Sequence, residues 1–283
     1  MRRARMATWK AAGASASCSS FPDAAKDKWD SQIIQEERLA MNIDAGKAAL
    51  VFGGSRGIGA AIVERLVREG YAVAFTYISS DAAAYEIEQN LIGHGGRAKA
   101  IKADSGKAED IRAAVSTAVE TFGKLDAVVV NAGIFRVATI DAVTESDLDE
   151  MLRINVRGVY LSIQAAAEHM NDGGRVVTIG SNVAVRTGFP GASVYQMTKA
   201  AVAAMVKGIA LDLAPRDITV NNIQPGPTDT DINAGGIAEL SKMSPLRRVA
   251  KPEEIAGLVA YAVNDEAGYM TGASLTIDGG FTL

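Results

Sequence analysis

The chain is poor in the side chains that bind metals or form disulfides. Among its 283 residues there is one cysteine, Cys18, and there are two histidines, His94 and His169. A lone cysteine cannot form an internal disulfide, which fits a reducing compartment. So few sulfur and imidazole ligands give no basis for a zinc site. We therefore expect a cytoplasmic protein with no metal.

Long apolar runs and a strong net charge are also missing. No run approaches the roughly 18 apolar residues that a membrane helix needs. The net charge of −4 gives no electrostatic reason to bind nucleic acid or an anionic membrane. Hydrophobic residues make up 48% of the chain and charged residues 22%, which suits a globular protein with a sizeable core. We expect neither a nucleic-acid nor a membrane partner.

The first 41 residues differ in composition from the rest. Residues 1–20 carry Arg2, Arg3, Arg5 and Lys10, many Ala and Ser, and no acid. An organelle transit peptide has this composition, so targeting by residues 1–20 is one interpretation. We favour a disordered N-terminal extension over residues 1–41, followed by one domain over residues 42–283.

From residue 47 onward, short apolar runs alternate with segments of helical periodicity. Several of the runs are apolar at every position, as in a parallel sheet that is covered on both faces. This alternation predicts an α/β fold with a single doubly wound, Rossmann-type parallel sheet and helices on both faces. We predict strands at 48–52, 72–77, 98–103, 127–130, 175–179, 219–224 and 274–278, and helices at 60–69, 82–91, 109–122, 147–170, 194–214 and 252–263.

A glycine-rich turn joins the first strand to the first helix. It reads Gly53-Gly54-Ser55-Arg56-Gly57-Ile58-Gly59. Glycine allows a tight turn and a close backbone approach, and the N-terminus of a helix attracts phosphate. The same letters fit the G-x-S-x-G nucleophile elbow of hydrolases. That alternative needs a downstream acid and a histidine in a late loop, and neither His94 nor His169 is placed there.

Tyr195 and Lys199 lie four residues apart on a predicted helix and so share a face. An ammonium group one turn away stabilises phenolate and is expected to lower the tyrosine pKa, which suits acid–base work. Ser181 follows a predicted strand at the carboxyl edge of the sheet, where its hydroxyl can donate to a carbonyl oxygen. For an isolated Tyr–Lys pair, a solvated helix face is the usual explanation.

The order and spacing of several motifs favour a catalytic role for this Tyr–Lys pair over a solvated helix face. The glycine turn, Asn131-Ala132-Gly133, Asn155, Ser181, Tyr195 with Lys199, and Pro225-Gly226 follow one another as in the classical short-chain dehydrogenase/reductase family. The chain resembles this family from about residue 44 to its end. Within it, the chain is most similar to 3-oxoacyl-acyl-carrier-protein reductases and to a cyclic-di-GMP-binding group of biofilm dispersal mediators.

This resemblance implies a role for each matched residue. Tyr195 is the expected catalytic acid, Lys199 lowers its pKa and holds the nicotinamide ribose, and Ser181 orients the substrate carbonyl. Asn155 is expected to hold a water that links Lys199 to solvent. Asp104 matches the aspartate that bonds the adenine amino group. One position departs from the family, since Phe52 stands where a threonine usually supports the turn through a hydrogen bond.

The second strand indicates which cofactor is used. NAD enzymes place an acid at the end of this strand to bond the ribose 2′-hydroxyl, whereas here the first acid, Asp81, comes late. Arg56 can supply positive charge to a 2′-phosphate, with Ser79 and Ser80 as donors. We therefore expect NADPH (or NADP⁺) in preference to NADH. The expected cofactor contacts are Gly53, Ser55, Arg56, Gly57, Ile58, Gly59, Tyr77, Ser79, Ser80, Asp104, Ser105, Asn131, Ala132, Gly133, Tyr195, Lys199, Pro225, Gly226 and Thr228.

Two functions follow from these patterns. The first is an NADPH-dependent ketoreductase, which reduces a 3-oxoacyl compound or a similar ketone to an alcohol. The alternative is a sensor of cyclic di-GMP or a related nucleotide on the same fold. Residues 229–248, with Gly235-Gly236, are expected to form a mobile lid over the pocket.

An oligomer is expected as well. The two long helices carry small apolar residues that we predict to face outward, and a partner's matching helices would cover them. The resemblance implies a homotetramer, with a homodimer as the simpler form. The predicted outward residues are Ala165, Ala166, Ala167, Ala200, Ala204 and Ile209.

Overall fold

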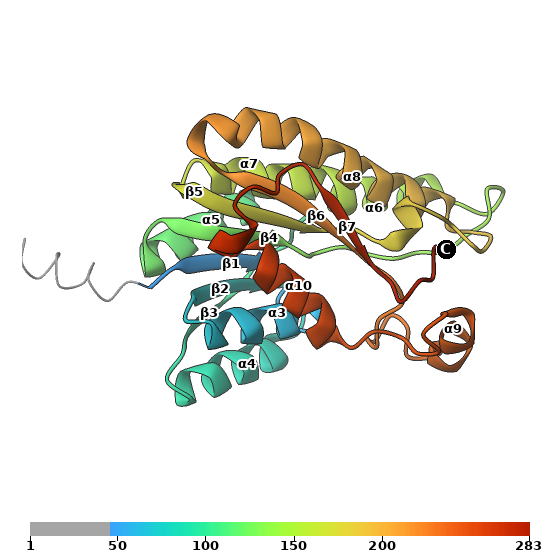
Figure 1. Ribbon diagram of the computed structural model, residues 1–283, viewed down its shortest axis with the longest axis horizontal. Helices are drawn as coiled ribbons and strands as arrows, with labels where there is room; N and C mark the ends of the chain where they lie inside the picture. Colours follow the sequence, from blue (N-terminus) through green and yellow to red (C-terminus); the bar gives the residue numbers. More distant parts are fainter. Residues whose placement is uncertain (1–45) are drawn as a thin grey trace, which may run out of the picture. The chain divides into compact units, whose positions relative to one another are not determined.

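A computed structural model describes residues 46–283, so the interpretation of residues 1–41 concerns a segment outside the described range. Within residues 46–283, seven parallel strands form one sheet in the order β3-β2-β1-β4-β5-β6-β7 (Figure 1). The predicted doubly wound α/β fold is confirmed. The strands are β1 (Ala48–Phe52), β2 (Ala72–Tyr77), β3 (Arg97–Lys102), β4 (Leu125–Val130), β5 (Met170–Ile179), β6 (Thr219–Pro225) and β7 (Ser274–Ile277).

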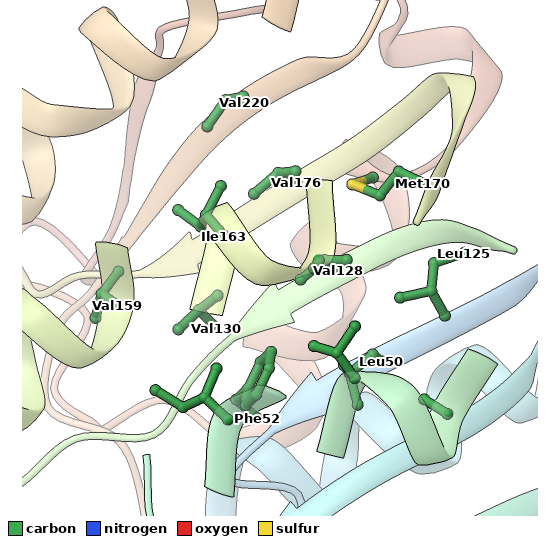
Figure 2. Close-up of a cluster of buried hydrophobic side chains, with 14 of the residues drawn as sticks. Leu50, Phe52, Leu125, Val128, Val130, Val159, Ile163, Met170, Val176 and Val220 are labelled. Carbon is green, nitrogen blue, oxygen red and sulfur yellow. The ribbon is translucent and has the colours of Figure 1, made fainter. Parts of the chain in front are cut away.

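The side chains of the all-apolar strands are buried on both faces of the sheet. In β1, Leu50 and Phe52 point to one face, and Ala49 and Val51 point to the other. All four are fully buried, because successive side chains of a strand alternate between faces and helices cover both. Figure 2 shows the first face, where Phe52 and Leu50 belong to one cluster with side chains from β4, β5 and α7.

The helices divide between the two faces. Helices α5, α7 and α8 pack on the face of Leu50, and α3, α4 and α10 pack on the face of Val51 (Figure 1). Helix α9 lies beyond the carboxyl end of the sheet. The α-helices are α3 (Gly57–Arg68), α4 (Asp81–Gly93), α5 (Ala108–Phe122), α6 (Glu145–Leu152), α7 (Val159–Ala167), α8 (Ser193–Leu213), α9 (Ile237–Met243) and α10 (Pro252–Ala262).

The strand order creates a switch point between β1 and β4. The chain leaves β1 toward β2 and β3, and β4 then starts the other half of the sheet on the opposite side of β1. The loops after β1 and β4 therefore diverge and leave a crevice at the carboxyl edge, where such folds bind ligands.

The single helix predicted over 147–170 is wrong in two respects. It consists of α6, a π-helical segment η1 (Arg153–Gly158) and α7, and it ends at Ala167. Met170 is already in β5 and pairs with Leu125 of β4. The buried Met170 continues the apolar helical pattern in the sequence, which hides the boundary. Helix α9 was not predicted, because it has seven residues and lies within the predicted lid.

Two of the residues predicted to face outward are buried within the chain itself. Ala166 packs in the core beside Ile163, and Ile209 packs there beside Val206. The prediction was wrong for these two because α7 and α8 both turn these positions toward the sheet. Ala200 and Ala204 are exposed, as predicted.

Among the described helices, none combines the length and the apolar character that a membrane crossing requires.

Candidate active site

The glycine turn is held from two neighbouring strands. Gly53 has φ +80°, a conformation that side-chain-bearing residues rarely adopt. Its N–H donates to Thr76 Oγ1 at 2.9 Å, and its carbonyl oxygen accepts from Asn131 Nδ2 at 2.6 Å. These bonds fix the turn between β2 and the end of β4, so its backbone is preorganised before any ligand binds.

Thr76 is a site residue that the sequence analysis missed. The threonine that the resemblance leads us to expect is replaced by Phe52, whose side chain is fully buried in the core. The hydroxyl that supports the turn comes from β2 instead, since Thr76 lies beside the turn and receives the Gly53 N–H. A threonine at the next-to-last position of the second strand is the only sequence signal for this replacement.

The N-terminus of α3 can receive an anion. Within residues 46–283 no side chain caps this helix, and its first turn contains no acid. A Cβ at Gly59 would collide with the Gly53 carbonyl, so only glycine allows the helix to start this close to the strand. Unpaired N–H groups and the helix dipole together attract phosphate. This end of the crevice fits the pyrophosphate of a dinucleotide.

Tyr195 lies on the first turn of α8 and lines the crevice. Burial raises the pKa of its phenol to about 12, although a hydrogen bond with the Ser181 side chain works in the opposite direction. The four-residue spacing predicts that Lys199 lowers the pKa of Tyr195, and in this structure that pKa is raised instead. Desolvation of the phenolate outweighs the other influences. Tyr195 is thus a neutral phenol at ordinary pH, the state required of a proton donor.

Lys199 is buried one helical turn from Tyr195. Its Nζ donates to the Ile179 carbonyl oxygen at 2.8 Å and lies 5.7 Å from the centre of the Tyr195 ring. Burial lowers the pKa of this ammonium group to about 8. The carbonyl at the end of β5 therefore fixes the lysine head group inside the crevice, on the same side as the tyrosine.

Asn155 is fully buried in the π-helical segment η1. Its Oδ1 accepts from the Ile134 N–H at 2.8 Å, and its Nδ2 donates to the Ile134 carbonyl at 2.8 Å and to Thr198 Oγ1 at 3.3 Å. The amide thus ties the loop after β4 to α8. The water that the resemblance assigns to Asn155 stays a prediction.

Two cavities share the crevice. The larger, of about 550 Å³, contains Ser181, Tyr195 and Lys199, and we call it the catalytic cavity. The smaller, of about 240 Å³, contains the glycine turn and the end of β2, and we call it the turn cavity. Ile58, Asn131, Gly133 and Ile134 are among the residues that line both, so the two cavities adjoin. Their arrangement suits a long ligand that runs from the glycine turn to Tyr195.

The predicted site residues gather here with three exceptions. The turn cavity is lined by Gly53, Ser55, Arg56, Gly57, Ile58, Tyr77, Ser79, Ser80, Ser105, Asn131, Ala132 and Gly133. The catalytic cavity adds Ser181, Tyr195, Lys199, Pro225, Gly226 and Thr228. Gly59, Asp104 and Asn155 line neither cavity. Asp104 accepts from the Gly106 N–H at 2.8 Å and lies 3.7 Å from Arg153 Nη1.

Two ion pairs of charged side chains, Arg56–Asp231 and Asp81–Lys102, lie at or near the turn cavity. Arg56 Nη1 lies 3.7 Å from Asp231 Oδ2, and both side chains are largely exposed, at 72% and 80%. Asp81 Oδ1 is 3.0 Å from Lys102 Nζ, which lowers the pKa of this carboxyl group. Lys102 thus offsets the acid nearest the end of β2. Asp231 and Lys102 were not anticipated, because both pairings join segments distant in sequence.

Comparison with known proteins supports this arrangement. Residues 53–282 match the family model described as Enoyl-(Acyl carrier protein) reductase. A short-chain dehydrogenase/reductase from Serratia marcescens is 51% identical, with a TM-score of 0.82 over 84% of this chain and 98% of that one. A short-chain dehydrogenase from Burkholderia cenocepacia in complex with NADP is 44% identical, with a TM-score of 0.81 over 84% and 98%. The cyclic-di-GMP-binding biofilm dispersal mediator protein of Escherichia coli is 41% identical over 85% of this chain and 99% of its own length.

Proposed function

Because the chain belongs to the short-chain dehydrogenase/reductase family, we propose that it is an NADPH-dependent reductase that converts a ketone to a secondary alcohol. One observation carries the proposal. Tyr195, Ser181 and Lys199 line one cavity, and that cavity adjoins the one that contains the glycine turn. A 3-oxoacyl thioester is one ketone of this class.

The residues of the turn cavity would hold the cofactor. The N-terminus of α3 and the Ser55 side chain fit the pyrophosphate, while Arg56, Ser79 and Ser80 fit a 2′-phosphate. The NADP complex of the similar Burkholderia cenocepacia protein supports this choice. NADPH, when bound, supplies the hydride for the reduction.

The side chains of the catalytic cavity would position the ketone and transfer a proton to its oxygen. Ser181 donates a hydrogen bond to the ketone oxygen and orients it toward Tyr195. Tyr195 then gives its Oη proton to that oxygen as charge develops on it. The raised pKa of Tyr195 keeps the phenol protonated before the transfer. Lys199, anchored on the Ile179 carbonyl 5.7 Å from the Tyr195 ring, would hold the nicotinamide ribose beside that ring.

The Tyr195→Phe variant tests this proposal. The ring and its packing remain and only the proton donor is lost, so we expect kcat to fall by about 10²–10⁴-fold. The dissociation constant of NADPH should stay within about twofold, as measured by fluorescence titration. A variant that keeps more than about a tenth of the wild-type rate would show that Tyr195 is not the acid.

Nucleotide sensing is the alternative, suggested by the similarity to the Escherichia coli protein. A sensor has no need for a buried phenol beside a serine hydroxyl and a buried lysine, which is why we favour the reductase. Calorimetric titration with cyclic di-GMP, with and without NADPH, separates the two functions. Micromolar binding in the absence of any ketone-dependent NADPH oxidation would favour the sensor.

We also propose that the chain assembles through α8, as a homodimer or a homotetramer. Met197, Ala200, Ala204 and Leu211 are exposed along one stripe of this helix. Their spacing of three, four and seven residues places them on the same face. A second copy of the same helix would cover them in an isologous contact.

A further inference from the structure

Part of the lining of the catalytic cavity is aromatic and apolar, and we call this part the wall. It is formed by Phe135, Val137, Phe189, Leu240, Met243 and Phe281. Three of the chain's seven phenylalanines therefore line this one cavity. The three phenylalanines come from separate segments, namely the loops after β4 and β5 and the C-terminal segment, and α9 adds Leu240 and Met243.

Phe135 places this wall next to the proposed proton donor, Tyr195. Its ring meets the Tyr195 ring edge to face, with centroids 4.7 Å apart and planes at 78°. The backbone of its neighbour Ile134 is bonded twice by the buried Asn155 amide. The ring is thus held beside the proton donor, where a substituent on the ketone would contact it.

Phe281 is also held in place. The Asp278 carboxylate accepts from the Gly280 N–H and from the Thr282 N–H, both at 2.9 Å. These bonds curl the C-terminal segment, and Phe281 N–H donates to the Asp278 carbonyl at 3.2 Å. The phenylalanine between them therefore stays at the cavity.

The charge of the cavity limits what can enter it. Among the described residues that line it there is no Asp or Glu, and the cations are Lys199 and Arg186. Both are engaged with backbone oxygens, since Lys199 Nζ bonds Ile179 and Arg186 Nη1 donates to the Leu283 oxygen at 2.6 Å. A cationic substrate would find no counter-charge here.

Helix α9 leaves apolar surface at the cavity uncovered. The described part of the chain buries none of its seven side chains. Met243 is 55% exposed and Ile232, just before the helix, is 59% exposed, and both line the cavity. Figure 1 shows α9 and the C-terminus at the same end of the molecule. A bulky apolar group in the cavity would cover these side chains.

We propose that the substrate is an uncharged ketone that carries an aromatic ring next to its carbonyl group. This proposal rests on the proposed reductase function. The ring packs between Phe135, Phe281 and the apolar side of α9. Aromatic pairs gain from edge-to-face geometry beyond the area that they bury. A rigid ring also loses less conformational freedom on binding than a flexible acyl chain does.

A matched pair of diketones tests the substrate class. NADPH oxidation is measured with 1-phenyl-1,2-propanedione and with 2,3-pentanedione, which present similar reactive carbonyls with and without the ring. We expect kcat/KM to be at least about tenfold higher for the phenyl compound. An N-acetylcysteamine thioester of 3-oxohexanoic acid is the third substrate, and we expect it to be the poorer one.

Variants connect the preference to the wall. Phe281→Leu should lower the ratio of kcat/KM for the phenyl compound to kcat/KM for 2,3-pentanedione by roughly two- to tenfold, the worth of an aromatic pair. Phe122→Leu, on α5 away from the cavity, is the control and should leave this ratio unchanged. If Phe281→Leu melts at a much lower temperature than the wild type, Phe189→Leu replaces it.

The outcomes separate the two proposals. Equal or better turnover of 2,3-pentanedione or of the 3-oxoacyl thioester overturns the aromatic substrate and leaves the reductase intact. An unchanged phenyl preference in both Phe→Leu variants overturns the role of the wall. NADPH oxidation with none of the three ketones overturns the proposed function itself.

Discussion

At the scale of residues, burial shifts the pKa values of two catalytic groups in opposite directions. The same desolvation raises the pKa of Tyr195 and lowers that of Lys199, because it disfavours phenolate in one case and ammonium in the other. The two groups, one helical turn apart, are thereby both moved toward their neutral forms. Ser181 lies beside the tyrosine and offsets part of this effect.

Lys199 should make the stability of the protein depend on pH. Its pKa of about 8 in the folded chain lies below the ordinary 10.5, so the unfolded chain binds more protons between these values. The free energy of unfolding should therefore rise with pH across this window. Relative to Lys199→Met, the wild type should gain about 2 kcal/mol between pH 7 and pH 9.5.

Urea unfolding of both proteins at the two pH values measures this gain. Other titrating groups cancel in the comparison, and Tyr195, with its raised pKa, affects stability only above about pH 10. The same stability difference at both pH values would mean that Lys199 is not desolvated.

Arg56 should discriminate between the two nicotinamide cofactors. Its guanidinium lines the turn cavity and is exposed, with Asp231 at 3.7 Å, so it is free to turn toward a 2′-phosphate. We expect Arg56→Ala to raise the dissociation constant of NADPH by at least about tenfold and that of NADH by less than about twofold. Fluorescence titration with each cofactor checks this. Equal weakening of both would make Arg56 structural and remove the basis for NADPH preference.

At the scale of elements, the turn between β1 and α3 depends on β2 through a single hydroxyl. Thr76→Val keeps the shape of the side chain and leaves the Gly53 N–H without its acceptor. We expect a loss of about 1 kcal/mol in the free energy of unfolding and a severalfold weaker affinity for NADPH. The second effect follows because the turn would no longer be preorganised for the pyrophosphate.

The matched control is Thr117→Val on α5. The Thr117 hydroxyl bonds the Ala113 carbonyl at 2.9 Å on an exposed helix face, so its removal should cost less than about 0.5 kcal/mol. Urea unfolding and cofactor titration of both variants give the comparison. An unchanged NADPH affinity in Thr76→Val would show that another contact holds the turn.

At the scale of the whole molecule, the exposed stripe of α8 predicts an assembly. Leu211 is 77% exposed, and Met197, Ala200 and Ala204 continue the same face. Ala204→Glu should lower the mass measured by sedimentation at micromolar concentration, because a charge would have to be buried in the contact. Ala113→Glu, at an exposed position of α5, should not change it. A monomeric wild-type protein would contradict the prediction. Ala166→Glu is unsuitable for this test, since Ala166 belongs to the core.

Much of this molecule can be predicted from the sequence because the relevant signals are local. The alternation of strands and helices, the glycine turn after β1 and the four-residue spacing of Tyr195 and Lys199 each depend on short segments. Parallel strands must bring their carboxyl ends to one edge, so the fold class also placed Ser181 beside that edge.

Only the tertiary structure decided the rest, because it depends on contacts between distant segments. Thr76 replaces the hydroxyl missing at Phe52 since β2 lies beside β1, and the Asn155 amide reaches Ile134, 21 residues away. The pKa of Tyr195 rose instead of falling, because the depth of the crevice is a property of the packed chain. Phe135, Phe189 and Phe281 meet in one cavity because three different elements end there, and no spacing in the sequence records that.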